Sequence, residues 1–189
     1  YEQFWGSTLA PNRGLTVVEI MHAIKDGQIK GMYILGENPA MSDPDVQHAR
    51  EALAKLEHLV VQDLFLTETA WHADVVLPAA ASWCESEGTV TSSERRVQRV
   101  RKALEPPDGA RDDIVILCDL AHRMGHDWGA PSAEQVWDEI RRLSPWHGGM
   151  SYQRLEEHGG LQWPCPTEDH PGSLLLHDRL WKRPIVGPP

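Results

Sequence analysis

Three short apolar runs alternate with helical patterns in the first 80 residues, and this alternation constrains the fold more than any other feature of the sequence. The apolar runs cover residues 29–35, 58–62 and 74–78, and the last ends at a proline. Helical patterns lie before and between them, at residues 17–26, 44–56 and 67–73. Strands that alternate with helices over short connections are typical of a parallel sheet covered by helices. The sequence therefore predicts an α/β fold.

Local signals mark where the first two helices begin and end. Thr16 with Glu19 three residues later forms a capping box, and Gly27 is a typical helix stop. In the second helix, Asp43 is the expected cap and Pro44 suits the first turn.

Fewer strands are predicted in the second half of the chain. The basic run at residues 95–101 is expected to form an exposed strand or extended segment, and helices are expected at 112–124, 132–143 and 152–158. From Ser144 the chain is rich in Pro, Gly, His and Trp, which indicates a tail that packs on a neighbour. We therefore predict an α/β domain over residues 1–130 and a helical, loop-rich extension over 131–189.

Composition narrows the classes of partner. The chain has 189 residues, with 28 acidic and 18 basic side chains and a formal net charge of -10. This charge disfavours nucleic acid or an anionic membrane as a partner bound through bulk charge. No apolar run approaches the ~20 residues of a membrane span. The first residue is not methionine, and both ends of the chain suggest a piece of a longer polypeptide.

The three cysteines argue against a metal cluster held by this chain alone. Cys84, Cys118 and Cys165 are far apart and form no CxxC pair, so neither an iron–sulfur cluster nor a disulfide framework is expected. This favours a reducing compartment, the cytoplasm. His122 and His126 have the spacing of two metal ligands on a helix, but Gly125 ends that helix, so a structural or solvent-facing pair is favoured.

Ligands of parallel α/β sheets bind beyond the carboxyl ends of the strands, and three polar segments follow the predicted strands. Gly36-Glu37-Asn38-Pro39 could approach a ligand closely or simply end a strand. Gln62-Asp63 offers acceptors for a purine or a sugar, or a cap for the helix at Thr67. The segment at residues 85–89 could hold phosphate, although an ordinary solvated loop is the simpler interpretation.

No catalytic motif accompanies this edge. The chain has neither the GxSxG elbow of hydrolases nor the GxxxxGK[ST] loop of nucleotide hydrolases. The residues alone therefore predict a ligand-binding α/β domain without visible catalytic machinery.

Several strings together carry a family resemblance. GMYILGENPAMSDPD, LEHLVVQDLFLTETAWHADVVLPAA, ESEGTVTSSERRVQRVRKALEPP and DDIVILCDLAHRMG resemble the alpha subunit of formate dehydrogenase, of the dimethyl sulfoxide reductase type of molybdopterin oxidoreductases. The late QWPCP segment and SDPD favour formate dehydrogenase over nitrate reductase. The resemblance implies a Rossmann-like domain that holds one guanine dinucleotide arm of bis-molybdopterin guanine dinucleotide.

The resemblance also implies site residues, which lie at the strand ends and in the neighbouring loops. Gln62 and Asp63 are expected against the guanosine, and Asp113 is expected to accept hydrogen bonds from guanine N1 and N2. The full implied set is Gly36, Glu37, Asn38, Ser42, Gln62, Asp63, Leu77, Pro78, Ala79, Ser86, Glu87, Gly88 and Asp113. Relatives often carry lysine at position 86, so Ser86 lacks a charge for the phosphate.

What the family uses for chemistry is implied to lie outside these 189 residues. The ligand of the molybdenum or tungsten, the neighbouring histidine and arginine, and the 4Fe–4S cysteines belong upstream, and none of the three cysteines matches them. The implied partners are the other domains of the same subunit and electron-transfer subunits. Two alternatives stay open: a nitrate reductase-like enzyme, or a structural module of the kind retained in the large NADH dehydrogenase subunit.

Overall fold

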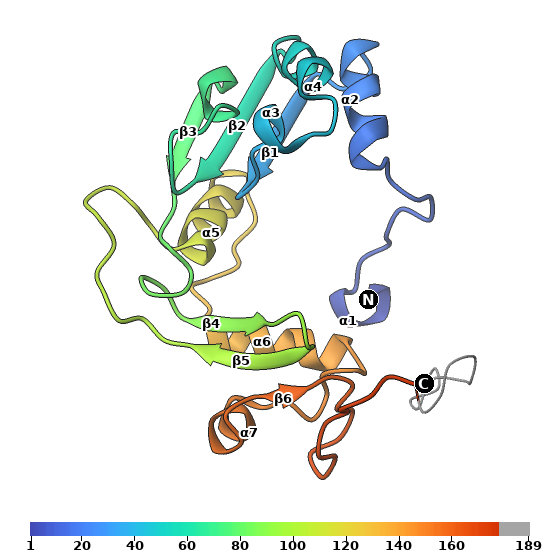
Figure 1. Cartoon of the computed structure of the whole chain (residues 1–189), viewed down its shortest axis with the longest axis vertical. Helices are drawn as coiled ribbons and strands as arrows, with labels where there is room; N and C mark the ends of the chain where they lie inside the picture. Colours follow the sequence, from blue (N-terminus) through green and yellow to red (C-terminus); the bar gives the residue numbers. More distant parts are fainter. Residues whose placement is uncertain (178–189) are drawn as a thin grey trace. The chain divides into compact units, whose positions relative to one another are not determined.

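Residues 1–177 of the computed structural model are described here, and their contacts divide the chain into two units. We call residues 8–81 with 106–116 the parallel-sheet unit, and residues 1–7, 82–105 and those from 117 onward the antiparallel unit (Figure 1). The chain thus passes between units several times before residue 130. The predicted boundary at residue 130 stays a prediction, and the contacts divide the chain elsewhere.

The parallel-sheet unit contains the three predicted strands side by side in chain order. They are β1 (Gly31–Leu35), β2 (His58–Asp63) and β3 (Val75–Pro78), and both pairings are parallel. Leu35 lies opposite Gln62, and Asp63 lies opposite Pro78, so all three carboxyl ends meet at one edge. This confirms the predicted α/β fold, and the binding of a ligand at this edge of the sheet stays a prediction.

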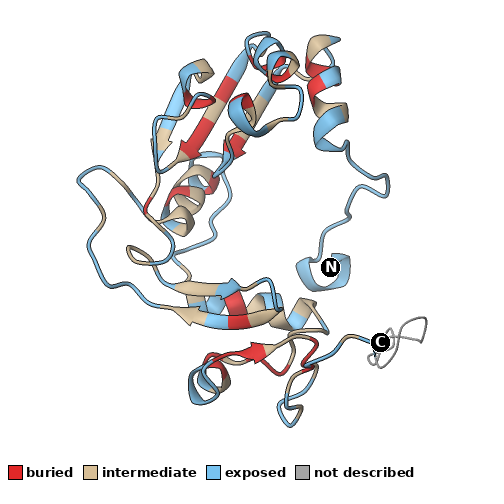
Figure 2. Cartoon of the chain, in the orientation of Figure 1, coloured by how far each residue is buried: buried red, intermediate tan, exposed pale blue. Residues whose placement is uncertain are grey.

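Two helices of this unit pack together through small side chains. Helix α2 (Val17–Lys25) has both bonds of the predicted capping box, and α4 (Val46–Leu53) contributes Ala49 and Ala52 to a cluster with Met21 and Ile24. Most of the buried residues of the unit lie in β1, β2 and these helices (Figure 2), and Ala40, Ala70 and Ile116 are buried as well. Alanine side chains are small and let the two helix backbones approach closely. The buried face of α4 therefore consists partly of alanines rather than of large apolar side chains.

Three details of this unit differ from the prediction. The cap of α4 is Asp45, whose side chain accepts from the His48 N–H, while Asp43 accepts from the Asp45 N–H in the turn before it. A short helix, α3 (Pro39–Ser42), was not predicted, because four residues carry no periodicity. The predicted helix at 67–73 is only a 3-10 turn, η1 (Ala70–His72).

The antiparallel unit contains a second sheet that the sequence did not predict. Strands β4 (Gly88–Thr91), β5 (Arg96–Val100) and β6 (Leu161–Gln162) pair in that order. The predicted strand at 95–101 is confirmed as β5, but it is not simply exposed, because Val97 is fully buried. The hairpin turns at Arg95, which has a left-handed φ of 67°.

The predicted helices of the second half are all present. They are α5 (Asp113–Arg123), which continues from the parallel-sheet unit into the antiparallel unit, α6 (Ala133–Leu143) and α7 (Tyr152–Glu157). A further short helix, α1 (Glu2–Trp5), contacts α6 through a hydrogen bond from the Trp5 indole to Glu139. No helix within residues 1–177 is long and apolar enough to cross a membrane.

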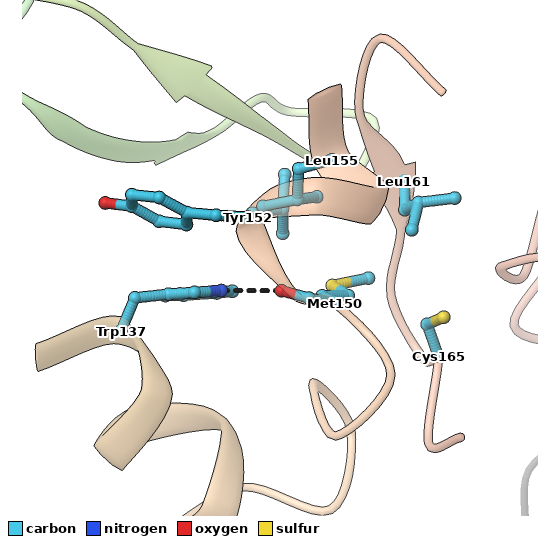
Figure 3. Packing of buried hydrophobic residues seen from close by; sticks show 7 residues of the cluster. Trp137, Met150, Tyr152, Leu155, Leu161 and Cys165 are labelled. Atoms are coloured by element: carbon cyan, nitrogen blue, oxygen red, sulfur yellow. Dashed lines mark hydrogen bonds between the residues drawn. The ribbon is translucent and has the colours of Figure 1, made fainter. Parts of the chain in front are cut away.

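The loop-rich extension contributes a hydrophobic core rather than only a covering. The Trp137 indole of α6 donates to the Met150 carbonyl at 2.6 Å, and Leu155 of α7 packs beside them (Figure 3). The complete cluster is Val97, Trp137, Met150, Tyr152, Leu155, Leu161 and Cys165. The β4–β5 hairpin therefore belongs with the C-terminal extension, since its buried side chain Val97 needs this cluster.

Replacing Leu155 tests the importance of that core. Leu155 is 1% exposed, so Leu155→Ala leaves a cavity, and we expect it to lower the free energy of unfolding by about 2–5 kcal/mol. Urea denaturation followed by circular dichroism measures the change. The matched control is Leu174→Ala, since Leu174 is 78% exposed and should change stability by less than about 0.5 kcal/mol.

Candidate functional site

The carboxyl edge of the parallel sheet gathers residues from the ends of β1, β2 and β3. The Gly36 N–H donates to the Gln62 carbonyl at 2.9 Å, and the Ala79 N–H donates to the Asp63 carbonyl at 3.1 Å. Gly36 has a left-handed φ of 65°, which glycine adopts without strain, and an added Cβ there would meet nothing within 4 Å. The backbone turns away from β1 at a point that is open to an approaching group.

Asp113 joins this edge through the start of α5. The Arg111 N–H donates to the Pro78 carbonyl and the Ala80 N–H donates to the Arg111 carbonyl, which aligns the segment before α5 beside the end of β3. The Asp112 side chain then accepts from the Ile114 N–H at 2.9 Å. As a result, Asp113 stands in the first turn of the helix at the sheet edge, half-buried.

Gln62 and Asp113 are directly bonded, although 51 residues separate them. The Gln62 Nε2 donates to Asp113 Oδ1 at 2.5 Å, and Gln62 itself is 1% exposed. The Tyr33 hydroxyl of β1 donates to the other end of the same carboxamide, Gln62 Oε1. Burial, followed by the charge of Asp113, raises the pKa of the Tyr33 phenol, so it remains a proton donor at neutral pH.

Tyr33 is the site residue that sequence reasoning missed. It lies within the apolar strand GMYIL, where an aromatic residue reads as core. Its hydroxyl was the available signal, because a buried phenol needs a hydrogen-bond partner. Without the fold, nothing indicated that the partner was Gln62.

Asn38 serves the structure of the edge. Its Oδ1 accepts from the Thr69 N–H at 3.1 Å and from the Thr69 hydroxyl at 2.8 Å, and its Nδ2 donates to Glu68 at 2.7 Å. Thr69 is fully buried and also accepts from the Ala40 N–H at 3.0 Å. These bonds join the turn after β1 to the crossover before β3, as expected for a strand-ending turn.

The remaining predicted residues of this unit have simpler surroundings. Glu37 is exposed, and the Ser42 hydroxyl donates to the Asn38 carbonyl at 3.1 Å. Asp63 does not cap a helix at Thr67, since its carboxylate accepts from the adjacent Leu64 N–H at 2.6 Å. Leu77 and Pro78 are the last two residues of β3.

Ser86, Glu87 and Gly88 belong to the antiparallel unit, whereas the sheet edge belongs to the parallel-sheet unit. The predicted loop ends earlier than expected, because Gly88 is the first residue of β4 and lies opposite Val100. Ser86 is half-buried in a bend, and Glu87 forms an ion pair with Arg99 at 2.7 Å. A phosphate-binding role for these three residues stays a prediction.

The basic run of β5 is paired with partners inside the unit. Arg96 pairs with Glu94 at 3.0 Å and Arg101 pairs with Glu156. Arg95 donates to the carbonyls of Trp163, Ser173 and Leu174. These contacts explain how a run of basic residues occurs in a protein whose composition disfavours polyanion binding.

Arg99 is the most enclosed of these arginines. Its guanidinium lies 3.7 Å from the ring centre of Tyr152, and its side chain is 16% exposed. Within residues 1–177, the Arg99 Nε and the Tyr152 hydroxyl are buried without a hydrogen-bond partner. Arg99 thus connects Glu87, just before β4, to the core of the antiparallel unit.

The metal-ligating residue types do not gather in the described part of the chain. Within residues 1–177, no group of three or more His, Cys, Asp or Glu side chains could hold a metal ion. His122 and His126 are both exposed, and Cys165 is fully buried in the core, while Cys84 and Cys118 are half-buried.

Thr69→Val tests the buried link between the β1 turn and the crossover. Valine keeps the shape but leaves the Ala40 N–H and part of the Asn38 carboxamide unsatisfied, so we expect a loss of about 1–3 kcal/mol in the free energy of unfolding. Urea denaturation measures it. Thr91→Val, on an exposed position of β4, is the control, and an equal loss in both variants would contradict the assignment.

Arg99→Ala tests the contact between Glu87 and the core. Loss of the ion pair and of the stacking on Tyr152 should lower the free energy of unfolding by about 1–2 kcal/mol. Arg99→Lys should recover only part of this, because lysine keeps the charge but lacks the planar guanidinium. Thermal and urea denaturation report the effect, and Arg96→Ala is the control because its ion pair is more exposed.

Comparison with known proteins supplies the family. The sequence profile of the molybdopterin oxidoreductase family matches residues 6–123. The F420-dependent formate dehydrogenase subunit alpha of Methanocaldococcus jannaschii is 47% identical over 94% of this chain. The assimilatory nitrate reductase catalytic subunit of Bacillus subtilis is 41% identical over 92% of this chain.

The match covers only part of these relatives. The chain spans 26% of the formate dehydrogenase subunit and 25% of the nitrate reductase subunit. Among solved structures, acetylene hydratase from Pelobacter acetylenicus superimposes with a TM-score of 0.59 at 24% identity, over 77% of this chain and 20% of that protein. This structural likeness concerns the fold. From the profile match and the sequence identities together, the chain belongs to the molybdopterin oxidoreductase family.

Proposed function

We propose that this chain is the part of a formate dehydrogenase catalytic subunit that holds one guanine nucleotide arm of bis-molybdopterin guanine dinucleotide. The observation that carries the proposal is the Asp113 carboxylate, which lies at the carboxyl edge of the parallel sheet and is bonded to the buried Gln62. Family membership implies a molybdopterin cofactor. The guanine dinucleotide form and formate as substrate belong to the proposal.

The chemistry of the donor set fits a guanine nucleotide. Guanine presents two neighbouring donors, N1–H and N2–H, and an ionised carboxylate is an acceptor at both oxygens. A bidentate, charge-assisted pair of this kind is stronger than a neutral hydrogen bond, and adenine cannot form it. Gly36, with its open left-handed turn at the same edge, leaves room for the backbone to approach the nucleotide.

The other predicted residues take supporting roles in the proposal. Glu37, Ser42, Asp63 and Ala79 line the rest of the edge, and Asn38 keeps the turn after β1 in place through Thr69. Ser86, Glu87 and Gly88 would meet the phosphate or pterin end of the same arm. Glu87 is already engaged by Arg99, so among these three the phosphate contact rests on Ser86 and the Gly88 backbone.

The chain contributes binding, and the bound cofactor supplies the molybdenum or tungsten centre for the two-electron oxidation of formate to carbon dioxide. The residues of this chain orient one end of that cofactor and exclude the wrong nucleotide. In this proposal, the ligands of the metal and of a 4Fe–4S cluster come from other parts of the subunit.

Nitrate reduction is the second candidate, and a specific observation supports it. The Bacillus subtilis nitrate reductase subunit is 41% identical to this chain, against 47% for the Methanocaldococcus jannaschii formate dehydrogenase subunit. Nucleotide binding by this segment would serve either reaction. Assaying the full catalytic subunit with formate and with nitrate separates the two, and turnover of nitrate alone would contradict the formate assignment.

Asp113→Asn tests nucleotide binding directly. Asparagine still accepts from Gln62 but loses the charge that faces guanine, so we expect GDP to bind the variant about tenfold to a hundredfold more weakly than wild type. Calorimetry measures the dissociation constant. The shift in melting temperature gives a second measure, since GDP at a hundred times its dissociation constant stabilises by about 2.7 kcal/mol.

Asp108→Asn is the matched control. Asp108 is exposed in the turn before α5, so this variant changes the net charge equally without touching the site. Equal GDP affinity in the Asp113 and Asp108 variants would contradict the site. A wild-type chain that gains no stability from GDP at millimolar concentration would overturn the binding role and favour a purely structural module.

A further inference from the structure

Three side chains from three elements form a continuous hydrogen-bonded chain at the sheet edge. The Tyr33 hydroxyl of β1 donates to Gln62 Oε1 of β2, and Gln62 Nε2 donates to Asp113 Oδ1 of α5 at 2.5 Å. All three residues belong to the parallel-sheet unit. Each hydrogen bond polarises the next, so the three-residue network holds the Asp113 carboxylate more firmly than an isolated Gln62–Asp113 pair would.

The Gln62 carboxamide, in the middle of this network, cannot use water as an alternative partner. Gln62 is 1% exposed, so a carboxamide oxygen without a donor would be a buried unsatisfied acceptor. A carboxamide can also turn over and exchange its oxygen with its nitrogen. With the nitrogen toward Tyr33, the oxygen of Gln62 would face the Asp113 carboxylate, and two acceptors would repel each other. The Tyr33 hydroxyl favours the orientation in which Gln62 donates to Asp113.

We propose that Tyr33 is a positioning residue that determines purine specificity, acting through Gln62 on the Asp113 carboxylate. This inference rests on the proposed nucleotide site and adds to it a residue that never touches the ligand. A carboxylate accepts in about four directions, and Gln62 occupies one of them. By occupying one acceptor direction, Gln62 fixes the plane of the Asp113 carboxylate and hence the directions of its remaining lone pairs.

Purines differ in what a fixed carboxylate plane can recognise. Guanine offers N1–H and N2–H side by side, hypoxanthine offers only N1–H, and adenine presents an acceptor at N1. The preference for guanine over hypoxanthine depends on both carboxylate oxygens lying in the plane of the base. A carboxylate that rotates still finds N1–H, but it loses the second bond. Loss of the Tyr33 hydroxyl should therefore weaken GDP more than IDP.

Tyr33→Phe isolates this effect, because it keeps the ring in β1 and removes only the hydroxyl. We expect wild type to bind GDP more tightly than IDP and ADP. In Tyr33→Phe, GDP affinity should fall by about threefold to tenfold while IDP affinity changes by less than about twofold. In the Asp113→Asn background, the same substitution should leave the ratio of the GDP to the IDP dissociation constant unchanged. Calorimetry with the 189-residue chain and each nucleotide provides all these values.

Tyr152→Phe is the matched control. It also removes a phenol oxygen, but that oxygen is buried without a hydrogen-bond partner within residues 1–177 and lies in the antiparallel unit. It should leave the ratio of GDP to IDP affinity at the wild-type value. Gln62→Glu is a second variant for use if Tyr33→Phe does not fold; it keeps the shape of Gln62 and places a carboxylate toward Asp113, so it should reduce the ratio at least as much.

The outcomes separate this inference from the proposed function. If wild type prefers GDP and Tyr33→Phe weakens GDP, IDP and ADP equally, Tyr33 is merely structural and the inference is wrong. If wild type prefers GDP and the ratio is unchanged in both Tyr33→Phe and Gln62→Glu, the inference is also wrong while the site survives. If wild type binds none of the three nucleotides, the proposed function fails and the inference fails with it.

Discussion

The buried carboxamide of Gln62 is the contact on which the candidate site depends. Its backbone carbonyl accepts from Gly36, and its side chain joins Tyr33 to Asp113. Three elements that are far apart in sequence are thereby brought to one position in the sheet. A buried amide is costly unless both of its ends are bonded, so this arrangement tolerates little variation.

The antiparallel unit is organised around a different constraint. Val97, Tyr152 and Leu155 come from a hairpin and a helix more than 50 residues apart, and together they exclude water from the core. Arg99 extends this core outward by stacking on Tyr152 and pairing with Glu87. The segment before β4 is therefore held by the C-terminal extension, which explains why the hairpin and the extension belong to one unit.

Under the proposed function, this part of the chain would serve recognition rather than chemistry. The half-buried Asp113 carboxylate and the open turn at Gly36 would hold one end of a large cofactor, and no catalytic side chain is required for that task. The net charge of -10 is compatible with this proposal, because a carboxylate that selects guanine would bind through local geometry rather than through overall charge.

Local signals predicted what depends on neighbours in sequence. The capping box at Thr16 needs a partner only three residues away, and it is present. Apolar runs likewise predicted the strands of the parallel sheet and the edge at which these strands end, since the period and length of an apolar run indicate how its residues are buried. The strand-end position indicated Gln62 as a candidate site residue, and the family resemblance added Asp113, which spacing alone did not.

Tertiary structure decided whatever depends on distant partners. The hydrogen bond of Gln62 spans 51 residues, and that of Tyr33 spans 29, so no local pattern could reveal either. The same holds for the hydrogen bonds between Asn38 and Thr69. It also holds for Gly88, which the sequence placed in a loop and which lies in a strand opposite Val100. The sequence by itself determined the strands of the parallel sheet, the longer helices and their order, because backbone propensity and periodicity act within a few residues. Only the fold determined which polar groups satisfy one another, because buried hydrogen bonds form between elements and are chosen by packing.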